Sequence, residues 1–196
     1  IDENNQISVI NLPESTPIGP IEQLSFNTNH THQETRVPGT LCWDQNDQTL
    51  NLTHPGNVTQ QLGQELYGYV RNNSGNTITN GTAVRFNGAV INGTARLAVS
   101  PFEANGEFPN LYGVGIATQD IANDQDGRVT VWGKLRDINT TGGVENWQTG
   151  DILYISPFIP GALTKIKPTA PNNVIPVAAV LKVDEFEGEI FVRPTI

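Results

Sequence analysis

The chain has 196 residues, a formal net charge of −9 and a pI of about 4.7; only 16% of its residues are charged, and it contains 19 Gly and 13 Pro. This composition argues against a helical bundle, a coiled coil and a charge-driven disordered chain. The absence of Lys and Arg clusters argues against a nucleic-acid partner, and no apolar run approaches the ~20 residues that span a bilayer, so we expect no membrane partner either. Because the sequence contains no Met, we expect a processed form or part of a longer chain.

Residues 1–38 have the features of an extended arm. Residues 11–20 carry three prolines, and Pro38 closes the segment. Proline fixes φ and removes a backbone donor, so this region is unsuited to a long central strand. The arm nevertheless carries apolar side chains that need a surface on which to be buried, and we predict that they act in assembly: Ile7, Val9, Ile10, Ile18, Ile21, Leu24 and Phe26.

Residues 39–52, GTLCWDQNDQTLNL, predict a β-hairpin. Two alternating segments flank a polar turn at 44–48, which places Leu41 and Trp43 beside Leu50 and Leu52 on one face. An isolated hairpin is marginally stable in water, so we expect it to need partners and count Trp43 among the assembly residues.

From residue 64 onward, short alternating segments are separated by turns such as Asn80-Gly81, Asn87-Gly88 and Asp126-Gly127. Asn-Gly and Asp-Gly provide the positive φ that tight hairpin turns require. We therefore predict an all-β fold, with a β-barrel or β-sandwich domain over 65–196 preceded by the arm and hairpin over 1–64, and one helical turn near 118–123. The predicted strands are 64–70, 82–87, 95–99, 112–117, 128–135, 151–155, 174–183 and 189–193.

Motifs for chemistry are weak. His30 and His32 could form a metal pair, but no acid or thiol is placed by a motif to complete the ligand set, so a solvated loop is the preferred interpretation. Asp124 and Asp126 resemble half of a calcium loop without its closing Glu, so a turn into a strand is the preferred interpretation. No nucleophile elbow, phosphate loop or zinc helix is present. We therefore expect no catalysis and no cofactor, and we interpret the single cysteine, Cys42, as a small packing residue.

Seven Asn-x-Ser/Thr sequons leave open a secreted glycoprotein. The simpler interpretation is that these asparagines build turns. The sequons begin at Asn29, Asn51, Asn57, Asn72, Asn80, Asn92 and Asn139.

The ordered motifs from Gly39 onward resemble a module of tailed-bacteriophage virion proteins. The first block is the hairpin at 39–52. Later blocks are QLGQELYGYVRNNSG (61–75), TITNGTAVRFNGA (77–89), YGVGIATQDIANDQDGRVTVWGKL (112–135), GDILYISPFIPGALTKIKP (150–168) and GEIFVRPTI (188–196). The second half is also similar to capsid cement proteins.

This resemblance implies a non-enzymatic virion structural protein on the outer surface of the capsid or tail. It would be a capsid decoration or head-fibre subunit, forming a homotrimer and contacting the major capsid protein or other virion proteins. The alternative is a tail-fibre or receptor module that binds a host surface glycan through exposed aromatics, for which Trp132, Trp147 and Tyr112 are candidates. Of these we expect Trp132 to lie in the core of its strand, whereas Trp147 falls in a loop.

Overall fold

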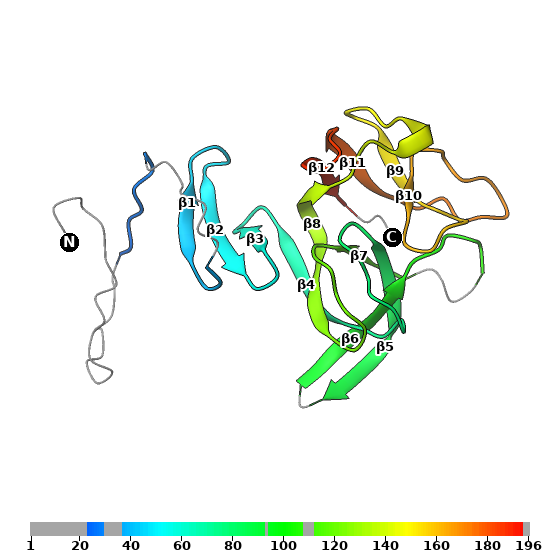
Figure 1. Ribbon diagram of the computed structural model, residues 1–196, viewed down its shortest axis with the longest axis horizontal. Helices are drawn as coiled ribbons and strands as arrows, with labels where there is room; N and C mark the ends of the chain where they lie inside the picture. The colour runs from blue at the N-terminus through cyan, green and yellow to red at the C-terminus, as the bar shows by residue number, and fades with distance from the viewer. Residues whose placement is uncertain (1–22, 30–36, 93, 108–111, 194–196) are drawn as a thin grey trace.

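The computed structural model describes residues 23–29, 37–92, 94–107 and 112–193. These residues form an almost entirely β structure, which confirms the predicted fold class (Figure 1). One 3-10 turn, Gly143–Glu145, interrupts the strands. The strands are β1 Leu41–Asp44, β2 Thr49–His54, β3 Val58–Gln61, β4 Leu66–Asn72, β5 Ala83–Asn92, β6 Thr94–Pro101, β7 Gly113–Ala117, β8 Asp126–Ile138, β9 Ile152–Ile155, β10 Leu163–Thr164, β11 Pro176–Lys182 and β12 Gly188–Val192.

The first three strands form a separate antiparallel sheet, in the order β1-β2-β3. The predicted hairpin is confirmed, with Leu41 opposite Leu52 and Trp43 opposite Leu50. Strand β3 was not predicted. Its sequence, Val-Thr-Gln-Gln, has a single apolar residue and therefore no alternating signal.

Strands β4, β6, β5, β7 and β8 close into a five-stranded barrel. Closure occurs because β8 pairs with both β4 and β7. Small β-branched and alanine side chains fill the interior, as the narrow lumen of a five-stranded barrel requires. They are Val70, Ile78, Val84, Val99, Ala117, Ile121 and Val129.

Strand β8 is 13 residues long and continues beyond the barrel, where it pairs with β12. Strands β11, β9 and β10 extend this second part of the sheet. A larger apolar core fills the space between this extension and the barrel, and it contains Phe102, Ile116, Leu135, Trp147, Leu153, Ile155 and Ile190 among others. One strand therefore belongs to both packed units.

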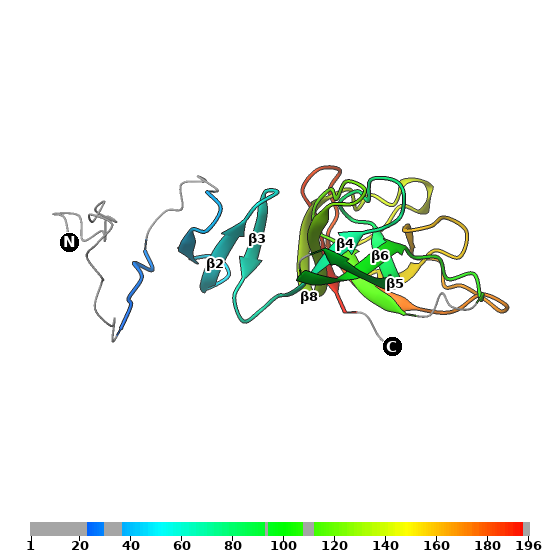
Figure 2. The same cartoon turned by 90° about the horizontal axis from the view of Figure 1, so that it is seen from below.

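Gly133 lies within β8 at a position that requires glycine. Its φ is +110°, and an added Cβ would lie 2.8 Å from the Gln64 carbonyl oxygen and 2.9 Å from the Glu65 Cα. Only glycine accommodates both this conformation and this close approach. The β3–β4 connection therefore packs directly against β8, beside the three-stranded sheet (Figure 2).

The helical turn predicted near 118–123 is wrong. This segment contains bends and an isolated bridge in which Ile78 and Ile121 exchange backbone hydrogen bonds of 2.9 and 2.8 Å. Burial of Ile121 in the barrel interior favours this extended pairing over a local helix. Among the described residues, no helix has the length and apolar character needed to cross a membrane.

Candidate functional site

The three-stranded sheet has an unusual distribution of side chains. Leu41, Trp43, Leu50 and Leu52 share one face, which we call the leucine face. Leu41 is exposed and the other three are only half-buried. A sheet normally buries its apolar face and exposes its polar one.

The opposite face is polar and yet buried. Thr49, Asn51 and Thr53 alternate with the leucines along β2 and are almost inaccessible to solvent. Their neighbourhood is held by side-chain hydrogen bonds, including Asn51 Nδ2 to Asp44 Oδ2 at 2.9 Å and Thr49 Oγ1 to the Leu62 carbonyl oxygen at 3.0 Å. Because the described part of the chain leaves the leucine face partly open, this face is a candidate contact surface.

The two edges of the sheet differ. On β3, the outward backbone groups are satisfied from the β4 side: Gln61 N donates to Glu65 Oε2 at 2.8 Å, and Tyr67 Oη donates to the Thr59 carbonyl oxygen at 2.9 Å. The edge of β3 is thus closed by two side chains at the start of the barrel domain.

The edge of β1 is open within the described chain. Thr53 N donates to the Thr40 carbonyl oxygen, so Thr40 directs its backbone groups toward β2. Successive residues of a strand direct these groups to alternate sides, so Leu41 and Trp43 direct theirs away from β2. No described strand pairs with β1 on that side. An open edge beside an apolar face is a template for another strand.

Ion pairs attach the three-stranded sheet to β8. Arg136 Nη1 lies 2.6 Å from Glu65 Oε1, and the Glu65 side chain is almost fully buried. Lys134 Nζ lies 2.7 Å from Asp47 Oδ1 in the β1–β2 turn. The hydrogen bond from Lys134 is the main cause that lowers the pKa of Asp47 below its ordinary 3.8. Burial, reinforced by the charge of Glu65, raises the pKa of Tyr67. Tyr67 is therefore a neutral donor at physiological pH.

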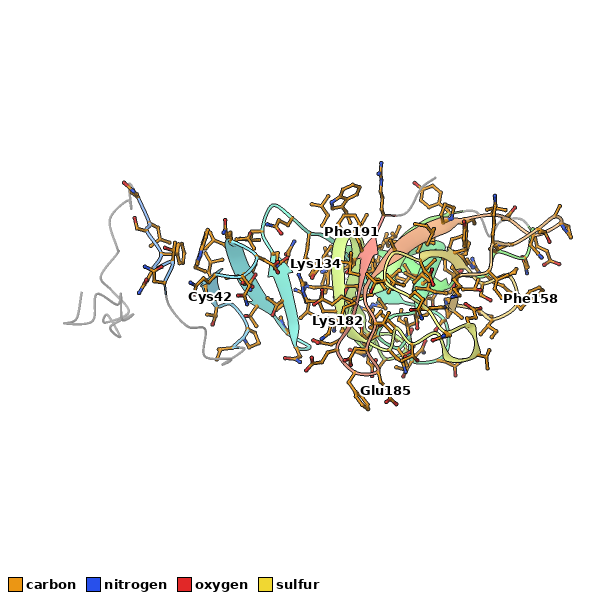
Figure 3. The ribbon with its side chains drawn as sticks, turned by 90° about the horizontal axis from the view of Figure 1, so that it is seen from above. Cys42, Lys134, Phe158, Lys182, Glu185 and Phe191 are labelled. Atoms are coloured by element: carbon orange, nitrogen blue, oxygen red, sulfur yellow. The ribbon has the colours of Figure 1, made fainter. Side chains whose placement is uncertain are left out.

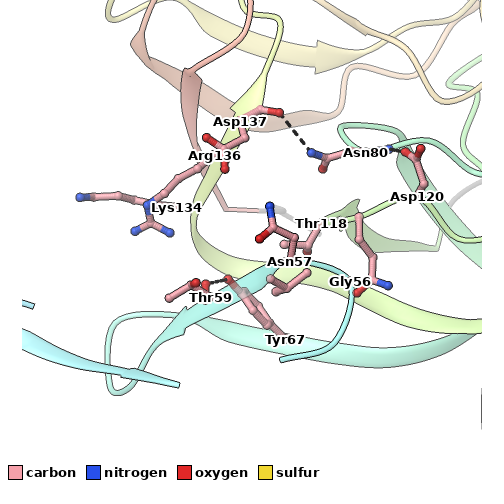
Figure 4. Close-up of a pocket in the computed structure, with 12 residues that line it drawn as sticks. Gly56, Asn57, Thr59, Tyr67, Asn80, Thr118, Asp120, Lys134, Arg136 and Asp137 are labelled. Carbon is pink, nitrogen blue, oxygen red and sulfur yellow. Dashed lines mark hydrogen bonds between the residues drawn. The ribbon is translucent and has the colours of Figure 1, made fainter. Parts of the chain in front are cut away.

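A polar cavity of about 550 Å³ lies at this junction, and we call it the junction pocket (Figure 4). The β2–β3 turn forms one wall, while β4, β8 and the loops at 80 and 118–120 form the others. Its lining residues are Gly56, Asn57, Val58, Thr59, Tyr67, Asn80, Thr118, Gln119, Asp120, Lys134, Arg136 and Asp137.

The pocket is rich in amides. Figure 4 shows Asn57 projecting from the turn toward the middle of the pocket, between Lys134 and Arg136 on one side and Asp120 on the other. Asn80 N donates to Asp120 Oδ1 at 2.8 Å, and Asn80 Nδ2 donates to the Asp137 carbonyl oxygen at 3.3 Å. The side-chain oxygens of Asn80 and Gln119 are buried and have no hydrogen-bond donor among the described residues.

A second apolar surface lies on the outside of the barrel domain. Leu66 is opposite Trp132 in register, and Trp132 packs edge-to-face on Phe191 with ring centroids 5.4 Å apart. The Arg193 guanidinium lies 5.4 Å from the centre of the Trp132 ring. Trp132 is 39% exposed, so the expectation that it lies in the core is wrong. The register of β8 against β4 skips Val131, between Thr130 and Trp132, and Trp132 faces outward next to this irregularity.

The other two aromatic candidates for glycan stacking differ in their exposure. Trp147 is 7% exposed and its Nε1 donates to Glu145 Oε2 at 2.8 Å, so its ring is unavailable as a stacking platform. Tyr112 is exposed and packs edge-to-face on Phe86 with ring centroids 6.0 Å apart.

Most of the predicted assembly residues lie outside the described chain, namely Ile7, Val9, Ile10, Ile18 and Ile21. Within it, Leu24 is 50% exposed, Phe26 is half-buried, and Trp43 belongs to the leucine face. The assembly role of all eight residues stays a prediction. Sequence reasoning missed the junction pocket; the turn signals Gly56-Asn57 and Asn80-Gly81 mark two of its walls.

The remaining sequence motifs have structural explanations where the chain is described. Asp126 begins β8 and pairs with Arg71 at 2.6 Å and Arg96 at 3.6 Å. No cluster of three or more His, Cys, Asp or Glu side chains suited to a metal occurs among the described residues; His30 and His32 lie outside them.

Cys42 is half-buried. Its burial, and to a smaller extent the charge of Asp44, raises the pKa of the thiol, which lowers its reactivity.

Two of the sequons are inaccessible in the folded chain. Asn51 and Asn72 are buried, and Asn72 Nδ2 donates to the carbonyl oxygens of Asn76 and Ile121 at 2.7 and 2.8 Å. These two asparagines therefore have structural roles.

A comparison of the chain with protein-family models, curated proteins and solved structures finds no match.

Proposed function

We propose that this protein is a non-enzymatic structural subunit of a bacteriophage virion, a homotrimer on the outer surface of the capsid that assembles through the β1 edge and the leucine face. The observation that supports this proposal most strongly is that no described strand pairs with the outer edge of β1, beside an apolar face whose four side chains remain partly exposed. The ordered motifs from Gly39 onward support the virion context.

The occupant of this edge is the apolar N-terminal segment of a neighbouring copy. Residues Ile7-Ser8-Val9-Ile10 are free of proline and mostly β-branched, which suits an added strand. Ordering four residues costs about 4–8 kcal/mol of backbone entropy. Backbone pairing alone does not offset this, since each hydrogen bond contributes only about 1 kcal/mol. Apolar burial is therefore required, at about 1.5–3 kcal/mol for each large side chain.

Sedimentation equilibrium of the intact protein tests this proposal. We expect a mass three times the 21.3 kDa of one chain. Leu41→Pro removes one outward N–H at the first residue of β1, where proline is tolerated within a strand. This variant should keep the β circular dichroism spectrum and sediment as a monomer.

Ile91→Lys is the matched control, because Ile91 is an apolar strand residue that is 83% exposed and lies far from β1. It should remain trimeric. A monomeric intact protein, or a trimer that Leu41→Pro leaves unchanged, would contradict the proposed interface.

A second candidate, attachment to a host surface through the barrel domain, is favoured by the exposed Trp132–Phe191 surface. Loss of cell binding in Trp132→Ala, with the trimer intact, would support this role in addition to the first.

A further inference from the structure

The junction pocket is built from groups that are far apart in the sequence. Lys134 and Arg136 come from β8, Asn57 from the β2–β3 turn, and Asp120 from the loop after β7. Its volume of about 550 Å³ falls within the roughly 300–1,000 Å³ of small-molecule sites. The buried Glu65–Arg136 pair fixes the two halves of the pocket relative to each other.

The charges of the lining do not favour an anion. Lys134 is neutralised by Asp47 at 2.7 Å, and Arg136 by Glu65 at 2.6 Å. Both cations thus have carboxylate partners on the side of the three-stranded sheet. Asp120 then adds negative charge at the opposite wall (Figure 4). An anionic ligand would be repelled by these carboxylates without gaining an unpaired cation.

The hydrogen-bonding groups favour a ligand that both donates and accepts. Asn57 makes no hydrogen bond with the described chain, although its φ of +60° holds it at the tip of the turn. The buried side-chain oxygen of Gln119 lacks a donor, and rotation about the last side-chain bond can turn that amide toward the pocket. Asp120 uses Oδ1 to accept from Asn80 N, leaving Oδ2 for a ligand hydroxyl.

The described lining is divided almost evenly between polar and apolar surface, and Val58 and the Tyr67 ring belong to its apolar part. An apolar ligand would leave the amides and carboxylates unpaired, which costs about 1–3 kcal/mol for each buried group. A sugar ring instead presents hydroxyl groups at its rim and an apolar C–H face that can lie against an aromatic ring.

From this chemistry we propose that the junction pocket binds a neutral carbohydrate unit, with Asn57 and Asp120 as the polar contacts and Tyr67 as the wall facing its C–H surface. The proposal is independent of the assembly interface, because the pocket lies beside β3 and β8 whereas the open edge belongs to β1.

Saturation-transfer NMR with the full chain tests this proposal. The probes are neutral mono- and disaccharides of glucose, galactose, mannose and N-acetylglucosamine, with sialyllactose and glucuronate as anionic comparators. We expect transfer to at least one neutral sugar, with a Kd of about 1 mM or tighter, and none to the anionic probes. Transfer to the anionic probes alone, or to no probe, would overturn the proposal.

Two variants locate the binding. Asn57→Gly deletes the amide at a positive φ that glycine adopts readily, and Asp120→Asn retains Oδ1 while removing the charge. Each should weaken binding about tenfold, the effect of one or two hydrogen bonds.

Gln48→Gly is the matched control, since Gln48 also has a positive φ, of +50°, but lies in the β1–β2 turn. It should bind like the parent chain. Equal binding by the parent and Asn57→Gly would contradict this site, and sedimentation of all variants as the parent separates the result from assembly.

Discussion

Gly133 is the residue on which the placement of the three-stranded sheet most directly depends. Its φ of +110° and the contact of its Cα with the Gln64–Glu65 backbone leave no room for a Cβ. The same approach carries Glu65 to Arg136 and so shapes the junction pocket. The backbone conformation of Gly133 therefore influences the geometry of the candidate sugar site.

We predict that Gly133→Ala lowers the free energy of unfolding by several kcal/mol, because backbone strain and a backbone clash act together. Gly88→Ala is the control: Gly88 has a φ of +88° with no atom within 4 Å of an added Cβ, so only about 1–2 kcal/mol of strain is expected. Urea denaturation measures both. Equal losses in the two variants would show that the close approach has no energetic role.

Carboxylates with lowered pKa values make the stability of the fold depend on pH. Burial acts to raise the pKa of Glu145, but hydrogen bonds from Thr164, Trp147 and Lys165 N bring it below the ordinary 4.5. For Asp47, the hydrogen bond from Lys134 dominates. A group whose folded pKa is lowered stabilises the fold above its ordinary pKa and loses this contribution as pH falls through the folded value.

We therefore predict a melting temperature that is steady from pH 7 to about 5 and falls below pH about 4. Glu145→Gln should lower the melting temperature at pH 7 and flatten its dependence at low pH. Calorimetry over this range measures the effect. A melting temperature that rises as pH falls below 4 would contradict the assigned direction.

At the scale of elements, the junction between β3 and β8 is held by a buried ion pair with supporting hydrogen bonds. Glu65 accepts hydrogen bonds from Gln61 N and Arg136 Nη1, and its Oε2 lies 3.0 Å from Tyr67 Oη. Removing one partner of a buried pair leaves the other without compensation and typically costs about 3–5 kcal/mol.

We predict that Glu65→Gln and Arg136→Met each destabilise the protein by about 3 kcal/mol, and that the double variant loses less than the sum, because the two residues are coupled. The exposed pair Lys182–Glu187, 3.0 Å apart, is the control. Glu187→Gln should have a much smaller effect. Additive losses at Glu65 and Arg136 would contradict the coupling.

Elements with local signals could be predicted from the sequence, whereas those that depend on distant contacts could not. The β1–β2 hairpin has alternating residues and a polar turn, so its register follows from a short segment. Strand β3 is polar, and its extended form depends on β2 and on Glu65 and Tyr67. Trp132 faces outward because β8 departs from strict alternation at Val131, where its register against β4 shifts, and its sequence does not signal this.

The junction pocket could not be predicted for the same reason. Its lining comes from segments near residues 57, 67, 80, 119 and 135, and no one of them carries a binding motif. Only the fold brings Asn57 opposite Asp120. The leucine face, by contrast, was predicted as a set of paired residues, although its partial exposure was not.

At the scale of the whole molecule, the described part of the chain is elongated, with the three-stranded sheet on one side of the barrel and the loop carrying Phe158 at the far end (Figure 3). This arrangement suits a subunit that is held at one end and projects from a surface.

We predict that deletion of residues 1–38 leaves the domain over 65–196 folded but prevents formation of the trimer. The arm supplies the apolar segment proposed to pair with β1, and at about 3.3 Å per residue it can extend on the order of 100 Å to a neighbour. Sedimentation equilibrium together with circular dichroism measures both properties. A truncated chain that still forms trimers would exclude the arm from the interface.

Immunogold electron microscopy of purified virus particles from cells that encode this chain tests the central claim most directly. The proposed function predicts regular labelling over the capsid surface, together with the intact chain in the particles by mass spectrometry. Labelling confined to tails would move the protein to a tail fibre and contradict the capsid assignment. Particles that carry neither label nor chain would contradict a virion function altogether.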